Sequence, residues 1–244
     1  MTTHPFLKLY LLILCAAIYS CTPKKNIKGD KKIIVQEING KYSILKNGKI
    51  FTIKGASGYI NLDELKRCGG NTIRIWDTTN VDKILKDANK NGISVIVGIS
   101  IPESQYLSYY NNTSKVSTDF KKIKKLINRL KSNPAILMWC VGNELVFPNK
   151  PSYYNFYKEF NNIVDMIHED DPDHPVTTTM VNFQKNDLVN LKIRTNIDVI
   201  SFNIFSRITE LKDDLKNFSW FWDGAYLITE WGIDGPWQGA PGTA

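Results

Sequence analysis

Buried-strand patterns and amphipathic-helix patterns alternate along most of this chain. Short runs of apolar, largely β-branched residues predict strands covered on both faces, and apolar positions three and four apart predict helices that cover them. The strands are predicted at 51–56, 72–76, 93–99, 135–142, 176–181, 199–205 and 226–229. The helices are predicted at 62–68, 81–91, 118–132, 153–169, 184–191 and 209–218. This alternation indicates an α/β protein with a parallel sheet.

The number of strands favours a closed barrel over a doubly wound sheet. No Gly-rich phosphate loop follows any predicted strand, which weakens the nucleotide-binding alternative. A complete barrel of this kind has eight strand-helix units, and only about a dozen residues follow the seventh strand. We therefore expect a (β/α)8 TIM barrel that lacks its last βα unit in this chain. Either the chain is a fragment of a longer protein, which we favour, or the sheet closes imperfectly and exposes two edges.

Two turn dipeptides precede the first barrel strand. The segments 36–43 and 44–53 are predicted to be extended, and Asn39-Gly40 and Asn47-Gly48 within them favour tight hairpin turns. The sequence therefore predicts a short N-terminal β-hairpin before the barrel.

The first residues have the zones of a secretory signal. Lys8 precedes an apolar stretch at 9–18, and a small residue precedes Cys21. This segment resembles a bacterial lipoprotein signal peptide, so we expect a signal peptide at 1–20, lipidation at Cys21, a tether at 21–33 and the barrel at 34–244. The resemblance implies secretion across the inner membrane and a lipid anchor at the cell envelope. An ordinary cleaved signal with a chance cysteine is the alternative.

Composition narrows the expected partners. The net charge is +7, but the basic residues gather in the tether and on the polar face of one helix, at Lys121, Lys122, Lys124 and Lys125. That arrangement is typical of a solvated helix face rather than a binding surface, and no nucleic-acid motif is present. His168 and His174 lie near three aspartates, but their spacing matches no metal cage and favours a polar turn. We expect no cofactor and no metal, and the oligomeric state stays open.

Two glutamates follow predicted strands and suggest the chemistry. Asn143-Glu144 follows the strand at 135–142, and Glu230 follows the strand at 226–229. Because the carboxyl ends of barrel strands meet at one rim, both side chains are expected there. Glycoside hydrolysis needs one carboxyl group to protonate the leaving oxygen and a second to attack the sugar or activate water. The pair therefore suggests a glycoside hydrolase acting on a carbohydrate.

Polar and aromatic residues on the same rim complete the candidate site. Glu144 is the candidate acid/base and Glu230 the candidate nucleophile, with Arg74 as a counter-ion that keeps Glu230 charged. A structural ion pair elsewhere in the barrel is the alternative explanation of Arg74, and we favour the contact with Glu230 over it. The residues predicted to bind substrate are Arg74, Asn143, Trp76, Asn203, Trp231 and Trp237.

Taken together, these motifs resemble the clan A glycoside hydrolases, most closely the family 2 TIM-barrel catalytic domain. The resemblance covers about 36–237 and rests on Gly70-Asn71-Thr72-Ile73-Arg74-Ile75-Trp76, Asn133-Pro134-Ala135, Gly142-Asn143-Glu144, Asp171-Pro172-Asp173-His174-Pro175 and Thr229-Glu230-Trp231-Gly232. It implies a retaining mechanism on β-glycosidic bonds, with Glu144 as acid/base, Glu230 as nucleophile, and Arg74 and Asn143 in support. Retention requires carboxyl groups about 5 to 5.5 Å apart.

The chain departs from that family in ways that keep two rivals open. Related enzymes often carry a tyrosine near the end of the sixth strand, where this chain has Phe205. The jelly-roll and immunoglobulin-like domains common in family 2 are also missing, so specificity cannot be borrowed from well-known relatives. One rival is a transglycosylase similar to the fungal β-1,3-glucanosyltransferases. The other is a surface glycan-binding protein without activity.

Overall fold

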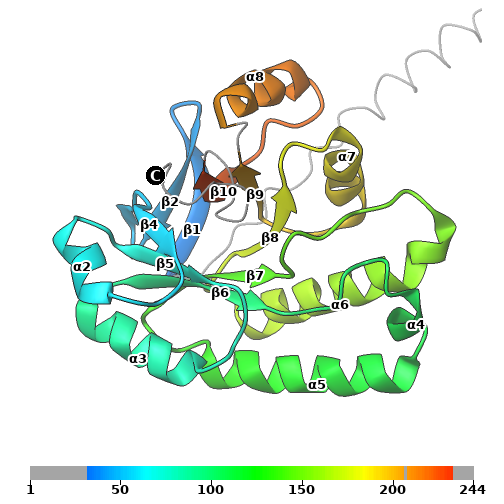
Figure 1. The fold of residues 1–244 in the computed structure, drawn as a ribbon, viewed down its shortest axis with the longest axis horizontal. Helices are drawn as coiled ribbons and strands as arrows, with labels where there is room; N and C mark the ends of the chain where they lie inside the picture. The colour runs from blue at the N-terminus through cyan, green and yellow to red at the C-terminus, as the bar shows by residue number, and fades with distance from the viewer. Residues whose placement is uncertain (1–31, 206–207, 233–244) are drawn as a thin grey trace, which may run out of the picture. The chain divides into compact units, whose positions relative to one another are not determined.

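A seven-stranded parallel sheet forms the centre of the computed structural model, which describes residues 32–205 and 208–232 (Figure 1). Its strands are β4 (Gly55–Ser57), β5 (Thr72–Ile75), β6 (Ser94–Ile99), β7 (Ile136–Val141), β8 (Val176–Val181), β9 (Val199–Phe205) and β10 (Tyr226–Gly232). They are neighbours in the order of the sequence, as in a (β/α) barrel. The predicted α/β barrel is thereby confirmed, with seven of its strands among the described residues. The predicted signal peptide, Cys21 and Trp237 lie outside the described residues.

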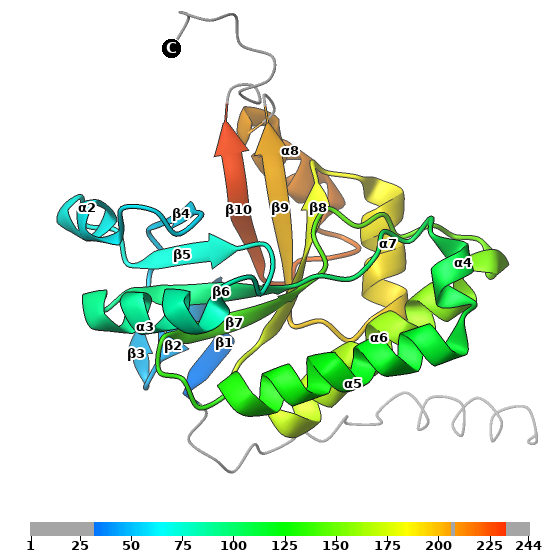
Figure 2. The same cartoon turned by 60° about the horizontal axis from the view of Figure 1, so that its bottom comes forward.

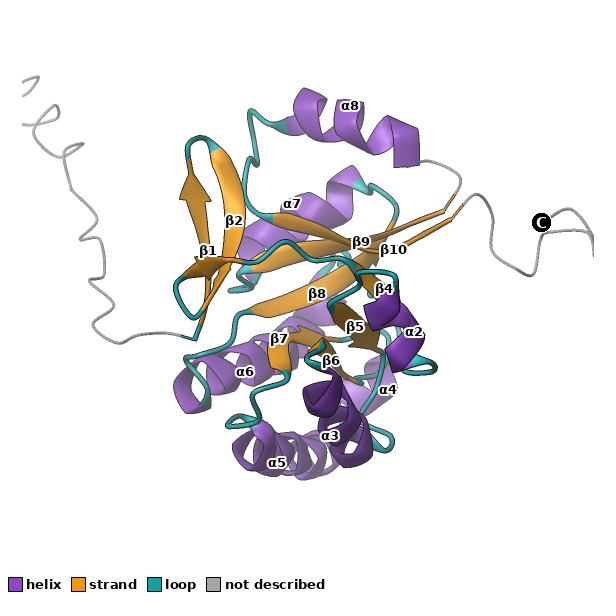
Figure 3. Cartoon of the chain, turned by 90° about the vertical axis from the view of Figure 1, so that its left-hand side faces the viewer, coloured by secondary structure: helices purple, strands orange, loops and turns teal. Residues whose placement is uncertain are grey.

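Helices cover the outer face of this sheet (Figure 3). They are α2 (Leu62–Arg67), α3 (Val81–Asn91), α4 (Leu107–Tyr110), α5 (Thr113–Leu130), α6 (Tyr154–Asp170, after a 3-10 turn at Pro151–Tyr153), α7 (Lys185–Arg194) and α8 (Ile208–Phe218). Outward strand residues such as Ile73, Trp139 and Phe202 pack with helix residues such as Leu85 and Phe160 in one apolar core. Among the described helices, none combines the length and apolarity needed to cross a membrane.

Several element boundaries differ from the sequence prediction. Helix α5 begins at Thr113 rather than near residue 118, because the Asn112 side chain caps it by accepting a hydrogen bond from the Lys115 amide at 3.1 Å. Strand β4 is only three residues long, and 51–54 lies outside any strand. Strand β10 continues to Gly232, so Glu230 lies within the strand and not after it.

The N-terminal hairpin has a third strand. β1 (Ile33–Ile38), β2 (Lys41–Lys46) and β3 (Lys49–Ile50) form an antiparallel sheet. Asn39-Gly40 and Asn47-Gly48 make its two turns, with φ of 52° and 74° in each pair, as a mirror-image turn requires. Side chains of this sheet, Ile33 and Ile44, pack against the inward residues Ile96, Met138 and Val199 of the barrel, which fills the barrel interior at the amino-terminal ends of the strands.

Strands β4 and β10 are the two edges of the barrel sheet (Figure 2). No strand pairing joins them in the described part of the chain, but the Ser57 hydroxyl donates to the Thr229 carbonyl at 3.1 Å. A cavity of about 480 Å³ lies along this seam, lined by Ala56, Tyr226, Ile228 and Trp231 among others. The barrel is therefore nearly closed, and Thr229 on β10 is held near the end of β4.

Candidate active site

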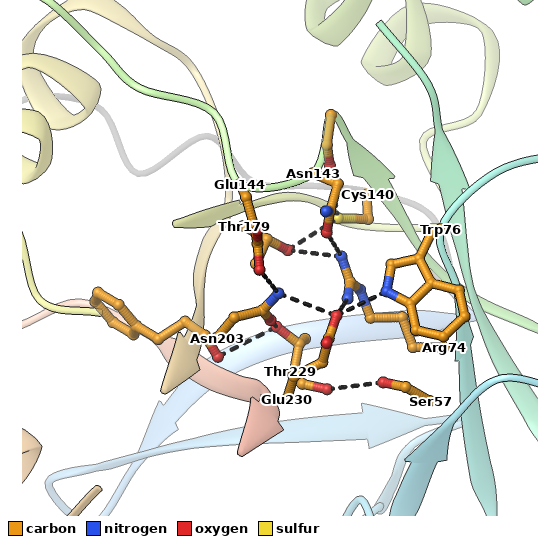
Figure 4. A network of polar contacts seen from close by, with 12 residues as sticks. Ser57, Arg74, Trp76, Cys140, Asn143, Glu144, Thr179, Asn203, Thr229 and Glu230 are labelled. Atoms are coloured by element: carbon orange, nitrogen blue, oxygen red, sulfur yellow. Dashed lines mark hydrogen bonds and ion pairs between the residues drawn. The ribbon is translucent and has the colours of Figure 1, made fainter. Parts of the chain in front are cut away.

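A polar cluster occupies the barrel interior at the carboxyl ends of the strands (Figure 4). Strand alternation places it there: Ile73 and Ile75 face the helices, so Arg74 between them faces inward. The same alternation turns Thr179 of β8 and Asn203 of β9 inward, and both are fully buried. Arg74 and Thr179, which are 105 positions apart in the sequence, are thereby in direct contact.

Glu144 reaches this cluster through a left-handed turn after β7. Gly142 has φ of 76° and Glu144 has φ of 54°. A Cβ on Gly142 would lie 2.3 Å from Leu145 Cδ1, so glycine is required there for space as well as for conformation. The Leu145 amide then donates to the Thr179 carbonyl at 3.2 Å, which fixes the turn to β8. A non-glycine residue in the left-handed region is typical of a functional constraint.

Glu230 reaches the cluster through a β-bulge. The register between β10 and β9 shifts between Ile228 and Glu230, so Thr229 is the extra residue and Glu230 pairs with Asn203. Paired residues on neighbouring strands point to the same side of a sheet, so the bulge turns Glu230 inward beside Asn203. With regular alternation and no bulge, Thr229 would face inward after the outward Ile228, and Glu230 would face outward.

One oxygen of Glu230 accepts three hydrogen bonds. The donors to Oε1 are Arg74 Nη1, Trp76 Nε1 at 2.7 Å and Asn203 Nδ2 at 3.0 Å (Figure 4). The other oxygen, Oε2, has no hydrogen-bond partner among the described residues, and the side chain is 19% exposed. Glu230 is therefore a carboxylate anchored at one oxygen and open at the other.

Asn203 links the two glutamates. Because its Nδ2 lies 2.8 Å from Glu144 Oε1 and 3.0 Å from Glu230 Oε1, these two oxygens are separated by at most the two bonds laid end to end, about 5.8 Å. This limit is compatible with the separation of about 5 to 5.5 Å used in retaining glycosidases and lies below the roughly 6.5 to 9.5 Å used in inverting ones.

Arg74 supplies the positive charge that balances the Glu230 carboxylate. Its side chain is 3% exposed, and a buried guanidinium needs a counter-charge and hydrogen-bond acceptors. Nη1 pairs with Glu230, while Nη2 donates to Asn143 Oδ1 at 2.6 Å and to Thr179 Oγ1 at 3.2 Å. Because arginine only donates, the Asn143 oxygen must face it, and the Asn143 amide nitrogen has no partner in the described residues. That nitrogen is available to a ligand.

The predicted substrate-binding residues do not all occupy the expected places. Trp76 and Asn203 contact the carboxylates instead of lining open space, although the Trp76 ring is still 42% exposed. Trp231 pairs with Ile204, whose side chain packs toward the helices, so Trp231 lies on the outer side of the sheet and is 69% exposed. Trp231 therefore faces the other side of the sheet from the two glutamates, because the bulge moves the inward position from Thr229 to Glu230. Its role in substrate binding stays a prediction.

Sequence reasoning missed the residues that hold the cluster in place. Thr229 Oγ1 donates to Asn203 Oδ1 at 2.9 Å, and Thr179 contacts Arg74. Gly98 on β6 allows the end of β5 to approach, since a Cβ there would lie 2.2 Å from the Trp76 carbonyl oxygen. A glycine inside an otherwise β-branched strand is the one signal in the sequence that could have indicated such a close approach.

The histidines belong to the opposite end of the barrel. His174 Nδ1 lies 2.8 Å from the buried Asp171 Oδ2, which also accepts a hydrogen bond from Trp139 Nε1 at 2.7 Å. His168 Nε2 lies 2.9 Å from Asp198 Oδ2. These pairs join loops to the barrel, and within the described ranges no group of three or more His, Cys, Asp or Glu residues could hold a metal ion.

Comparison with known families agrees with the fold. The model of the glycosyl hydrolases family 2 TIM barrel domain matches residues 32–230. The chain belongs to this family. It is a glycosidase domain of family 2, similar to the β-glucuronidase of Rattus norvegicus, with 28% identity over 158 residues that cover 56% of this chain and 23% of that protein.

Solved structures share the fold over most of the chain. The β-D-glucuronidase of Dictyoglomus thermophilum superposes with a TM-score of 0.63 at 20% identity, covering 84% of this chain and 39% of that one. A Bifidobacterium dentium β-glucuronidase complexed with coumarin-3-O-glucuronide gives 0.65 at 19%, covering 82% and 36%. A β-galacturonidase from Eisenbergiella tayi bound to galacturonate gives 0.63 at 20%, covering 82% and 38%. The chain spans less than two fifths of each of these proteins.

Proposed function

We propose that this chain carries the catalytic pair of a retaining β-glycoside hydrolase, with Glu144 as acid/base and Glu230 as nucleophile. The observation that supports this most directly is the single amide of Asn203 that donates to both carboxylates. It keeps their facing oxygens within about 5.8 Å, the range in which one carboxylate attacks the sugar directly.

In the first step, a Glu230 oxygen attacks the anomeric carbon of the sugar. The bond from that carbon to the leaving oxygen breaks, and the leaving oxygen takes the proton of the Glu144 carboxyl group. The products of this step are the free alcohol, a glycosyl ester on Glu230 and an ionised Glu144. Arg74 favours the ionised Glu230 before attack, because the guanidinium lies against it in a buried position.

In the second step, the ionised Glu144 takes a proton from a water molecule. The water oxygen bonds to the anomeric carbon, the ester bond breaks, and Glu230 recovers its negative charge. Both residues end in their starting protonation states, and two displacements leave the anomeric configuration unchanged. The free nitrogen of Asn143 is suited to donate to a sugar hydroxyl during both steps.

For the substrate we propose β-linked uronides as the first class to test. The β-glucuronidases and the β-galacturonidase that resemble this chain support the choice, and each of them extends well beyond the matched region. Transfer of the sugar to another sugar instead of water would use the same first step, so product analysis separates the transglycosylase from the hydrolase.

The experiment that tests this proposal is turnover of aryl β-glycosides, including a β-glucuronide and a β-galacturonide. We expect the wild type to release the aryl alcohol, and Glu230→Gln and Glu144→Gln each to lose at least about 1000-fold in kcat/KM on substrates with poor leaving groups. Glu169→Gln, an exposed residue on α6, is the matched control and should keep wild-type activity. Binding of glycans without any turnover would support the inactive glycan-binding alternative and contradict the proposal.

A further inference from the structure

Two uncharged donors hold the same oxygen of Glu230 that Arg74 holds. Trp76 Nε1 donates from the end of β5 at 2.7 Å, and Asn203 Nδ2 donates from β9 at 3.0 Å. Both reach Oε1, and neither reaches Oε2 (Figure 4). A carboxylate with only an ion pair could rotate about its last bond, whereas one with three donors converging on a single oxygen has one preferred orientation.

We propose that Trp76 and Asn203 are positioning residues that fix Oε1 of Glu230, so that Oε2 is the atom that bonds to the sugar. This inference rests on the proposed function and deepens it. Oε2 has no hydrogen-bond partner in the described part of the chain, and it belongs to a side chain that is 19% exposed. Because all three donors bind Oε1, Oε2 can approach the anomeric carbon of the sugar without first losing a hydrogen bond.

Asn203 donates a hydrogen bond to each of the two glutamates. Its side chain is fully buried, and each of the two hydrogens on Nδ2 has one acceptor, Glu144 on one side and Glu230 on the other. Its oxygen accepts a hydrogen bond from Thr229 Oγ1 at 2.9 Å, so a flipped amide would place oxygen against two carboxylates. The orientation of the amide is therefore fixed by its three neighbours. No other side chain of the described cluster contacts both glutamates.

Trp76 lies against Glu230, and Gly98 on the neighbouring strand β6 leaves the space for it. The indole nitrogen only donates, so its contact at 2.7 Å with a carboxylate oxygen is a charge-assisted hydrogen bond. Gly98 on the adjacent strand leaves space for the Trp76 carbonyl, which a Cβ would approach to 2.2 Å. The geometry differs from a sugar platform, which needs only the ring face and would leave the indole nitrogen without a fixed partner.

The indole proton signals test the hydrogen bond independently of activity. The chain has six tryptophans, and Trp76→Phe identifies the Trp76 signal in a ¹H–¹⁵N spectrum by its loss. Trp139 is an internal reference, because its Nε1 donates to the Asp171 carboxylate at the same distance of 2.7 Å at the other end of the barrel. We expect Glu230→Gln to move the Trp76 signal upfield and to leave the Trp139 signal in place. An unmoved Trp76 signal would overturn the proposal.

Inactivation by an activated 2-deoxy-2-fluoro β-glycoside separates positioning from binding. We expect Trp76→Phe and Asn203→Ala to lower the maximal inactivation rate about 10- to 100-fold while Ki changes little. In Trp76→Phe the ring face is kept and only the hydrogen-bond donor is lost. Trp220→Phe is the matched control, since this indole is 80% exposed and lies between α8 and β10, outside the candidate site. A sugar platform at Trp76 would instead give an unchanged rate with Trp76→Phe and a raised Ki with Trp76→Ala.

The outcomes distinguish this inference from the proposed function. A wild-type protein that is labelled at Glu230, with Trp76→Phe and Asn203→Ala labelled at the same rate, contradicts the positioning role and leaves the nucleophile intact. A wild-type protein that takes no label and turns over no glycoside contradicts the proposed function, and this inference with it.

Discussion

Arg74 on β5 forms an ion pair with Glu230 on β10, 156 positions later in the chain, across the interior of the barrel. The Arg74 side chain is almost fully buried, and its other terminal nitrogen is bound to Asn143 and Thr179. One guanidinium thus fixes the candidate nucleophile and the residue that precedes the candidate acid/base. The site depends on this residue for charge balance as well as for geometry.

Replacing Arg74 should lower both stability and activity. In Arg74→Met the Glu230 carboxylate loses its counter-charge, which for a buried pair costs about 3 kcal/mol in the free energy of unfolding. We expect kcat/KM to fall by at least about 100-fold. Urea unfolding and aryl glycoside turnover measure the two effects. The double variant Arg74→Met, Glu230→Gln should regain part of the lost stability, and an equally unstable double variant would contradict the assigned ion pair.

Gly142 should tolerate substitution less well than Gly92. Both have positive φ, 76° and 68°, so alanine at either position carries a backbone cost of about 1 kcal/mol. Only at Gly142 would the new Cβ also collide, at 2.3 Å from Leu145 Cδ1, and the collision would displace the turn that carries Glu144. We expect Gly142→Ala to lose about 100-fold in kcat and Gly92→Ala to keep kcat near the wild-type value. Equal kcat values for the two variants would show that the turn does not position Glu144.

Glu159 on α6 should make the fold less stable at higher pH. Burial raises the pKa of its carboxyl group to about 7, and Asp119 on α5 adds to the rise, whereas a hydrogen bond from Asn162 and the charge of Lys158 oppose it. The folded state therefore binds a proton that the unfolded state has released between about pH 4.5 and 7. Stability from this group is fully present below that window and is lost as pH rises through it, with a slope of at most about 1.4 kcal/mol per pH unit.

Urea unfolding across that window checks the prediction. Relative to the wild type, Glu159→Gln should remove the downward slope and be more stable at pH 8, because an amide pays no cost of burying a charge. Glu169→Gln changes an exposed carboxyl on the same helix and should leave the slope unchanged. A wild-type slope that survives in Glu159→Gln would assign the pH dependence to another group.

The strand and helix pattern was sufficient to predict the barrel and the rim on which both glutamates lie. Segments rich in β-branched and aromatic residues favour strands, so 176–181 and 199–205 could be located to the residue. The start of α5 could not, because Asn112 caps the helix through a side-chain contact within a polar stretch that has no apolar period.

The contacts within the site could not be predicted from the sequence, because they depend on the register between strands. A single bulge at Thr229 decides that Glu230 faces inward and Trp231 outward, and a register shift leaves no mark in the hydrophobic pattern of one strand. The contacts of Trp76 and Asn203 likewise depend on which side of the sheet the residues of the neighbouring strands face. The sequence predicts the members of the site, whereas their mutual contacts require the packed barrel.

The central claim is that Glu230 forms a covalent bond to the sugar while Glu144 transfers the proton. Its most direct test is mass spectrometry of peptides after reaction with an activated 2-deoxy-2-fluoro β-glucuronide or β-galacturonide. The account predicts one sugar per chain on the peptide that contains Glu230, and none in Glu230→Gln. A label on any other residue would contradict it.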